Sequence, residues 1–324
     1  MLDIKSHPKV SICIPAYKQT KFLAQTLDSI YLQDFKDYEI IVTDDSPDDS
    51  VETLIRSYDF GDKLKYIKNK VQKGSPANWN EAIKHSNGEY IKIMHHDDWF
   101  TNDKSLQEFV SLLDNNPLAD FAFSGCYNYI GERKNHHFVE YKNIEKLKTD
   151  PYILLLGNII GAPSVTIHRR SVLSRYDESL KWLVDLDFYI QLIKQNQNFG
   201  FSIEPLVSIC SMGDHQVTNE CVHNRNIEIP EYVYVYQKLL NHQSTLNKEQ
   251  KENILNLFFK YRITKISELE NLPLKSKIPK EIKTLFGLGL KIRMGIKLFR
   301  YSISHSTFSR QLKRIIKSFI IPVK

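Results

Sequence analysis

The chain has 324 residues, of which 42% are apolar, 11% aromatic and 25% charged, and this composition excludes disorder along its whole length. At roughly 150 residues per domain, the length accommodates one large domain with an appendage or two ordinary domains. The net charge of +6 is unevenly spread: residues 275–324 hold 13 basic residues and one acid, a net of +12, which leaves residues 1–274 at −6. The acidic body argues against a general nucleic-acid binder, whereas the basic segment by itself suits a phosphate backbone or anionic lipid.

The four cysteines, Cys13, Cys126, Cys210 and Cys221, are scattered and form no CxxC pair. Their spacing predicts neither a disulfide framework nor a zinc site, and fits a reducing compartment. The first ten residues lack an apolar signal segment, and no stretch reaches the roughly 18 uncharged apolar residues of a spanning helix. We therefore expect a cytoplasmic protein without a transmembrane helix.

Short β-branched runs and helical patterns alternate over the first 125 residues. We predict strands at residues 10–15, 38–43, 64–67 and 89–94, and helices at residues 20–33, 50–58, 76–87 and 102–115. This alternation predicts an α/β fold with a mostly parallel sheet that is covered by helices on both faces. Such sheets bind ligands beyond the carboxyl ends of their strands.

The second half of the chain has a mixed pattern that becomes helical after residue 227. We predict further strands within residues 120–125, 164–169 and 201–210, and helices near residues 151–156 and 187–196. Residues 271–279, with two prolines and a change of charge, are a plausible boundary before the basic segment.

Polar clusters follow three of the predicted strands, at residues 16–18, 44–46 and 95–98. Adjacent carboxylates repel each other unless a cation, a basic partner or solvent relieves the repulsion. The imidazoles and carboxylates of residues 95–98 suit Mn²⁺, and also Mg²⁺ where a phosphate adds oxygen ligands. The alternatives are that Asp97 or Asp98 only caps the next helix, and that Asp44 and Asp45 are ordinary turn residues.

Three segments in this order, residues 10–30, 38–52 and 73–99, resemble the family 2 glycosyltransferases of the GT-A fold. They look most like the bacterial enzymes that build capsule, lipopolysaccharide and O-antigen. The resemblance extends over residues 8–217 and implies a Rossmann-like sheet flanked by helices, here with a helical, basic C-terminal extension. It places the catalytic domain in residues 1–220, with a nucleotide-binding half (1–100) and an acceptor half (101–220), followed by a helical region (221–274) and the basic tail (275–324).

The resemblance also implies where a nucleotide-sugar donor binds. Asp44 takes the uracil ring or its ribose, and Asp45 is the neighbouring candidate. The full set comprises Pro15, Ala16, Tyr17, Asp44, Asp45, Lys73, Gly74, Asn78, Asn80 and His96. For Asn78 and Asn80, the alternative is a solvated helix face.

The metal motif of the family is Asp-x-Asp, and the matching triplet in this chain is His95-His96-Asp97. Asp97 corresponds to the last acid, which holds a divalent ion, Mn²⁺ or Mg²⁺, against the diphosphate. His95 replaces the first acid, so that it binds the metal differently or not at all. His215, in a loop that resembles the one closing over the diphosphate in related enzymes, is a further candidate ligand.

Asp185 aligns with the acid that serves as catalytic base, whereas Val184 stands at the position of the usual preceding glutamate. An acceptor hydroxyl must lose its proton as it attacks the anomeric carbon, and a positioned carboxylate can accept that proton. Apolar neighbours raise the basicity of such a carboxylate through desolvation. The alternative is that Asp185 or Asp187 caps the following helix. On the acceptor side the resemblance implies Asp98, Trp99, Pro163, Ser164 and Trp182.

The resemblance therefore implies an inverting glycosyltransferase that moves a sugar, from a UDP-sugar in particular, to a hydroxyl of a surface glycan or lipid-linked acceptor. A nucleotidyltransferase is a rival, but it would need a glycine-rich phosphate loop after the first strand, which residues 15–18 do not provide. A catalytically silent glycan- or lipid-binding protein is the second rival.

The basic tail interleaves apolar and basic residues over residues 282–300 and 308–321. This composition is typical of helices that lie at the surface of anionic membranes. We therefore predict a peripheral position at the inner face of a bacterial plasma membrane and no nucleic-acid partner. The alternative is a helix that packs on the catalytic domain with a solvated basic face.

Overall fold

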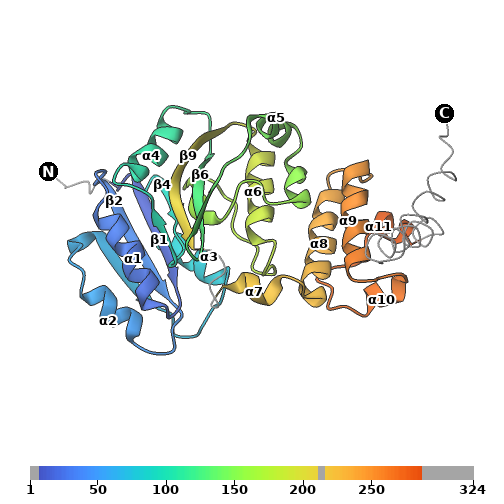
Figure 1. Ribbon diagram of the computed structural model, residues 1–324, viewed down its shortest axis with the longest axis horizontal. Helices are drawn as coiled ribbons and strands as arrows, with labels where there is room; N and C mark the ends of the chain where they lie inside the picture. The colour runs from blue at the N-terminus through green and yellow to red at the C-terminus, as the bar shows by residue number, and fades with distance from the viewer. Residues whose placement is uncertain (1–6, 211–215, 287–324) are drawn as a thin grey trace. The chain divides into compact units, whose positions relative to one another are not determined.

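The computed structural model describes residues 7–210 and 216–286 (Figure 1). The chain divides into two compact units, Met1–Glu228 and Ile229–Lys324. Candidate ligand His215 and tail residues 287–324 lie outside the described residues. No described helix combines the length and apolar character needed to cross a membrane.

The first unit is built on a sheet of nine strands among the described residues, in the order β3-β2-β1-β4-β8-β6-β9-β5, with β7 paired to β6. In chain order the strands are β1 (Val10–Ala16), β2 (Tyr38–Asp44), β3 (Leu64–Lys68), β4 (Tyr90–Ile93), β5 (Asp98–Phe100), β6 (Phe121–Ile130), β7 (Arg133–His137), β8 (Thr166–Arg169) and β9 (Phe199–Cys210). The helices of this unit are α1 (Thr20–Tyr31), α2 (Ser50–Arg56), α3 (Ala77–Lys84), α4 (Ser105–Asp114), α5 (Tyr141–Thr149), α6 (Val184–Gln195) and α7 (Val217–Cys221).

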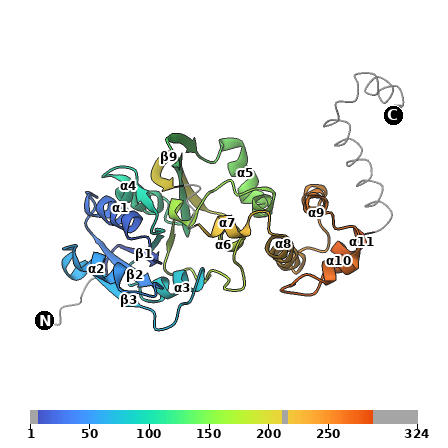
Figure 2. The same cartoon turned by 60° about the horizontal axis from the view of Figure 1, so that its bottom comes forward.

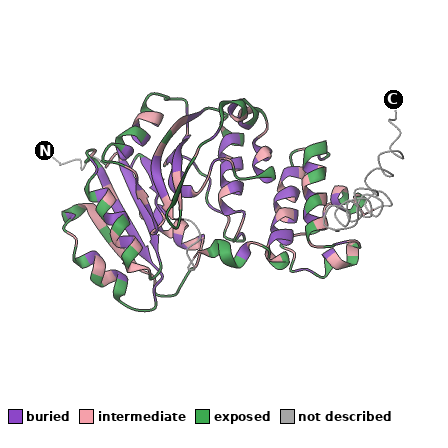
Figure 3. Cartoon of the chain, in the orientation of Figure 1, coloured by how far each residue is buried: buried purple, intermediate pink, exposed green. Residues whose placement is uncertain are grey.

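The longest ladders of the sheet are parallel, which confirms the predicted α/β architecture. β1 pairs in parallel with β2 and β4, β2 with β3, and β6 with β9, whereas β8, β5 and β7 join the sheet antiparallel. The chain moves outward from β1 to β3 and then returns to β4, so that right-handed crossovers place α1 and α3 on opposite faces (Figure 2). The sheet is therefore covered on both sides, and its strands β1 and β4 are buried along their whole length (Figure 3).

The sequence explains this packing at specific positions. All seven residues of β1 are buried, as its continuous apolar run predicts. Helix α4 lies close to β9 at Gly200, where a Cβ atom would be 2.7 Å from the carbonyl oxygen of Leu112. Between β6 and α6, the Phe121 ring packs on Phe123 and on Tyr189, with ring centroids 5.7 and 5.6 Å apart.

Some boundaries differ from the prediction, and these differences affect the site. The short strand β5 was not predicted, and Asp98 is its first residue. Helix α4 begins at Ser105 with Lys104 as its N-cap residue, so that neither Asp97 nor Asp98 caps it. The segment Pro151–Leu156 is a 3-10 helix, and a second one covers Pro163–Val165.

The second unit is helical, as the periodicity after residue 227 predicts. It contains the greater part of α8 (Arg225–Leu240), followed by α9 (Lys248–Lys260), α10 (Ile266–Glu270) and α11 (Lys280–Thr284). The side chains of Asn247 and Gln250 form a capping box at the start of α9. Ile282 of α11 is fully buried, which extends the core of this unit beyond the predicted boundary at residues 271–279.

Candidate active site

The carboxyl ends of β1 and β2 lie side by side. Ala16 pairs with Asp44 in the parallel ladder, and the backbone N–H of Asp45 donates to the carbonyl oxygen of Ala16 (3.0 Å). After β1, the backbone N–H of Lys18 donates to the Ser46 hydroxyl (2.6 Å). The Tyr17 ring is 38% exposed at this edge. The predicted residues at the ends of the two strands are therefore brought together.

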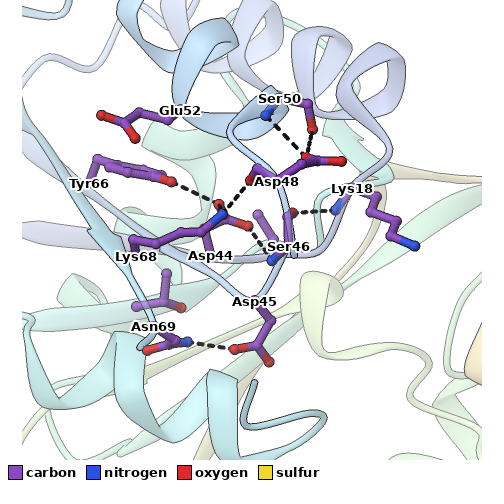
Figure 4. A network of polar contacts seen from close by, with 12 residues as sticks. Lys18, Asp44, Asp45, Ser46, Asp48, Ser50, Glu52, Tyr66, Lys68 and Asn69 are labelled. Carbon is purple, nitrogen blue, oxygen red and sulfur yellow. Dashed lines mark hydrogen bonds and ion pairs between the residues drawn. The ribbon is translucent and has the colours of Figure 1, made fainter. Parts of the chain in front are cut away.

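The Asp44 carboxylate is fully buried and accepts three hydrogen bonds (Figure 4). The donors are the backbone N–H of Ser46 (2.7 Å), the Tyr66 hydroxyl (2.8 Å) and the Lys68 ammonium (2.9 Å). Burial, followed by the hydrogen bond to Asp44, raises the pKa of Tyr66 above its ordinary value. A buried carboxylate needs such donors, and Asp44 obtains them from β3 and from its own loop.

Asp45 fastens the loop that precedes α3. Its carboxylate accepts hydrogen bonds from the Asn69 amide (2.7 Å, Figure 4) and from the backbone N–H groups of Lys73 (3.1 Å) and Gly74 (2.8 Å). Gly74 has a φ of +73°, a conformation that glycine adopts without strain. Lys73 and Gly74, both predicted at the donor site, therefore lie against Asp45.

The two predicted asparagines of α3 hold the structure around the site. Asn78 is 4% exposed, and its amide donates to the carbonyl oxygen of Thr43 (3.0 Å), so that a solvated helix face is the wrong interpretation for this residue. The Asn80 amide donates to the carbonyl oxygen of Tyr176 (2.8 Å) and accepts from its backbone N–H (3.1 Å). These bonds attach the segment before α6 to α3.

Beyond the end of β4, one ligand atom each from His95, Asp97 and Asp98 lie within 4.8 Å of one another. Asp97 and Asp98 are buried, and the His95 Nδ1 atom lies 3.8 Å from the Asp98 carboxylate. Burial and then the charge of Asp97 hold the pKa of Asp98 well above its usual range. Burial lowers the pKa of His95 to about 4, so that its ring is neutral at physiological pH. An imidazole and two carboxylates are a donor set that fits a divalent cation.

Neighbouring segments orient this cluster. The Ser164 hydroxyl accepts from the backbone N–H of His95 (3.0 Å) and also hydrogen-bonds the Asp98 carboxyl. The Nδ1 atom of His96 lies 3.2 Å from the carbonyl oxygen of Pro15, which links the cluster to the end of β1. Gln216, directly after the undescribed residues 211–215, donates its amide to Asp97 (3.2 Å).

Lys92 is a buried lysine near the cluster that the sequence interpretation missed. It lies on the central strand β4, is fully buried, and donates to the carbonyl oxygens of Ile93 (3.2 Å) and Ser164. Burial lowers the pKa of Lys92 to about 7, and the charge of Asp98 opposes this shift. A lysine within a continuous apolar strand was the signal that could have identified it.

Asp185 lies in the first turn of α6, which begins three residues earlier than predicted. Its carboxylate accepts from the Asn158 amide (2.7 Å) and from the backbone N–H of Leu186 (2.9 Å). Burial raises the pKa of Asp185 to about 6, while these two hydrogen bonds oppose the shift. Leu183 is the N-cap residue of α6, so that Asp185 belongs to the helix and does not precede it as the cap. Asn158 was not predicted.

The predicted acceptor-side residues fall into two groups. Pro163 and Ser164 are buried next to the His95–Asp98 cluster, and Trp182 is half-buried just before α6. Trp99 follows Asp98 on β5, so that the two side chains point to opposite faces of the sheet. The Trp99 ring packs on Tyr129, with centroids 5.4 Å apart.

Acids at the strand ends of a parallel sheet, together with a separate carboxylate of raised pKa, mark this edge of the sheet as a candidate active site. The protein-family model described as "Glycosyl transferase family 2" matches residues 11–177, which is more than half of the chain. An uncharacterized glycosyltransferase of Rickettsia typhi is 30% identical over 225 residues, which cover 67% of this chain and 68% of the relative. The chain belongs to glycosyl transferase family 2, and it is a glycosyltransferase.

Other similarities are shorter or lie in the fold alone. A GalNAc(5)-diNAcBac-PP-undecaprenol beta-1,3-glucosyltransferase of Campylobacter jejuni is 33% identical over 93 residues, 28% of this chain and 30% of the relative. The structure of S. aureus TarS 1-349 in complex with UDP-GlcNAc superimposes with a TM-score of 0.59 at 18% identity, covering 88% of this chain and 81% of TarS. A mannosyltransferase of Pyrobaculum calidifontis, in complex with GDP-Man and Mn²⁺, gives a TM-score of 0.54 at 14% identity, covering 90% and 87%. These structures show that the fold is GT-A.

Proposed function

We propose that this enzyme transfers a sugar from a UDP-sugar to a hydroxyl group of a surface glycan or lipid-linked acceptor, with inversion at the anomeric carbon. The observation that carries the proposal is the raised pKa of the Asp185 carboxyl, which Asn158 holds in place. A carboxylate whose pKa is about 6 is largely ionised at neutral pH and yet more basic than an ordinary aspartate. Such a group can accept the proton of an acceptor hydroxyl.

The reaction would be a single displacement. The acceptor oxygen forms a bond to the anomeric carbon while its proton passes to the Asp185 carboxylate. The bond between the anomeric carbon and the diphosphate breaks at the same time, and UDP leaves with that electron pair. Asn158 holds the Asp185 carboxylate in one orientation through its 2.7 Å hydrogen bond, so that little reorganisation precedes attack.

The donor set of His95, Asp97 and Asp98 fits Mn²⁺ or Mg²⁺, and the burial of the two acids supports this assignment. A divalent ion held there would supply positive charge to the leaving diphosphate. The chain itself contributes the orientation of the ligands, through Ser164 on His95 and Gln216 on Asp97. His215 remains a proposed additional ligand.

Donor recognition is proposed for the ends of β1 and β2. The partly exposed Tyr17 ring offers a surface for a nucleotide base next to Pro15 and Ala16. Asp44 and Asp45 already accept several hydrogen bonds from the chain itself. We therefore propose that, besides binding the donor, they hold the loops that surround the nucleotide. The UDP-GlcNAc bound by TarS supports a UDP-sugar, and the undecaprenol-linked acceptor of the C. jejuni relative supports a lipid-linked acceptor.

We also propose that the enzyme is cytoplasmic and meets its acceptor at an anionic membrane surface. Residues 275–324 carry a net charge of +12 interleaved with apolar residues. Each basic residue near anionic lipid contributes about 1 kcal/mol of attraction. A lipid-linked acceptor, which is confined to the membrane, would make this attraction useful.

The decisive experiment is a donor panel of UDP-, GDP- and dTDP-sugars, each with Mn²⁺ and with a chelator. We expect Mn²⁺-dependent release of UDP from one UDP-sugar, and NMR of the glycosylated product is expected to show an inverted anomeric configuration. Binding of donors without turnover, even with acceptor extracts present, would favour the catalytically silent protein. Release of a sugar 1-phosphate, with the nucleotidyl group passing to another acceptor, would indicate a nucleotidyltransferase.

A further inference from the structure

Two buried polar atoms beside the Trp79 ring have no hydrogen-bond partner among residues 7–210 and 216–286. They are the Tyr176 hydroxyl oxygen and the Nε2 atom of His95. Both rings pack against the same side chain, Trp79, with ring centroids 5.0 Å and 4.7 Å from it. Native structures rarely leave buried polar groups unsatisfied, so that two such atoms around one ring require an explanation.

The position of Tyr176 is fixed by the chain itself. Asn80 binds both the carbonyl oxygen (2.8 Å) and the backbone N–H (3.1 Å) of Tyr176. The Tyr176 ring stacks on Phe188 of α6, with centroids 4.1 Å apart, and the residue is 2% exposed. Phenylalanine would satisfy the same packing, so that the hydroxyl is the part without a structural task.

The chemistry of the two atoms indicates what they can bind. Burial, and then the nearby charge of Asp185, raises the pKa of Tyr176 above its ordinary value, so that the hydroxyl keeps its proton and remains a donor. The Nδ1 atom of His95 is the one that faces Asp98, which leaves Nε2 available. Trp79 is half-buried and therefore offers part of its ring to a ligand.

We propose that Trp79, Tyr176 and His95 form the subsite for the transferred sugar of the donor. Hydroxyl groups of a pyranose complete the hydrogen bonding of Tyr176 and His95, and a face of the sugar ring packs on Trp79. The location favours the sugar over the nucleotide, because Tyr176 stacks on Phe188, which lies one turn after Asp185 on α6, and Asp185, the proposed base, has to act beside the anomeric carbon. This inference rests on the proposed function of the same site.

Tyr176→Phe is the test, because it removes one oxygen atom and leaves the stacking intact. Calorimetric titration is expected to show unchanged affinity for UDP and about three- to tenfold weaker affinity for the UDP-sugar, the value of one hydrogen bond. In the absence of ligand the variant is expected to melt at a higher temperature, since an unsatisfied buried hydroxyl has been removed.

Tyr38→Phe is the matched control. Tyr38, the first residue of β2, is also buried, but its hydroxyl donates to the carbonyl oxygen of Ile30 in α1 (3.4 Å). This variant is expected to melt at a slightly lower temperature and to bind UDP and the UDP-sugar as the wild type does.

Two results would overturn the inference. One is a Tyr176→Phe variant with wild-type affinity for the UDP-sugar, and the other is a lower melting temperature, which would show that the hydroxyl has a structural partner. If the wild-type protein itself binds no nucleotide sugar, the proposed function fails first. The two failures are therefore distinguishable.

Discussion

Replacing Asp185 by asparagine should separate catalysis from binding and from stability. The amide retains the shape of the side chain and can still accept one of the two hydrogen bonds, from Asn158 or Leu186. It cannot accept a proton, so that turnover should fall by about 10² to 10⁴-fold, the usual contribution of a general base. The affinity for UDP should not change.

The same substitution should stabilise the folded protein at neutral pH. The pKa of Asp185 is raised from 3.8 to about 6 by burial, a shift of about two units, and each unit corresponds to about 1.4 kcal/mol. Because the side chain is only partly buried, solvent screening reduces this to a cost of about 1 to 2 kcal/mol. The folded state binds the proton more tightly, so that the cost develops as the pH rises from about 4 to 6 and is complete above 6.

Thermal melts of wild type and Asp185→Asn at pH 3.5 and pH 7.5, together with steady-state kinetics and UDP titration, check both expectations. The melting temperatures should differ at pH 7.5 and converge at pH 3.5. Asp187→Asn is the matched control, since Asp187 lies in the same helix and accepts from Gln191 (2.6 Å). A UDP affinity that falls as much as the rate, or a stability difference that is independent of pH, would refute the assignment of Asp185 as a desolvated base.

Asp97→Ala should abolish transfer and Mn²⁺ binding, whereas His95→Ala should retain measurable transfer; equal and complete loss in both would contradict this ranking. The pKa of Lys92 is about 7 in the folded state against an ordinary value of 10.5, so that its contribution to the free energy of unfolding rises between about pH 7 and 10.5. Lys92→Met should abolish this rise; variant and wild-type curves of unfolding free energy against pH that run parallel would contradict the lowered pKa. A protein that ends at Phe286 keeps Ile282 of α11 in its core and should retain donor hydrolysis but no longer sediment with anionic liposomes at low salt. Liposome binding that survives the truncation would assign the membrane contact to another surface.

The sequence alone predicted those strands whose residues are buried on both faces in an unbroken apolar run. Strands β1 and β2 are apolar runs buried on both faces, and such runs are distinguishable from helices by length and β-branching. Strand β5 escaped prediction because it has three residues and begins with an aspartate. The early start of α6 escaped prediction because its first turn contains two acids, Asp185 and Asp187, which also suit a position before the helix.

From the sequence alone, residues of the candidate site could be predicted only where they lie at strand ends. The acids after β2 and β4 stand in local clusters, which a motif can capture. Asn158 contacts Asp185 across 27 positions and Gln216 contacts Asp97 across 119, and no local pattern indicates such pairs. The resemblance placed Asn80 in the donor-binding set, and the contact of its amide with the backbone of Tyr176, 96 positions away, is another pair that no local pattern indicates.

The replacement of the first acid of the Asp-x-Asp motif by His95 leads to a last prediction about charge. The cluster already holds Asp98 at a pKa well above its usual range, because Asp98 is buried beside Asp97 and the charge of Lys92 on β4 offsets this shift only in part. His95→Asp would add a third carboxylate, so that the metal-free protein should melt at a lower temperature while Mn²⁺ raises the melting temperature by more than in the wild type. The neutral variant His95→Asn is the control for lost packing against Trp79, and its Mn²⁺ response should not exceed that of the wild type. If His95→Asp responds to Mn²⁺ no more strongly than His95→Asn, the cation does not bind among these three residues.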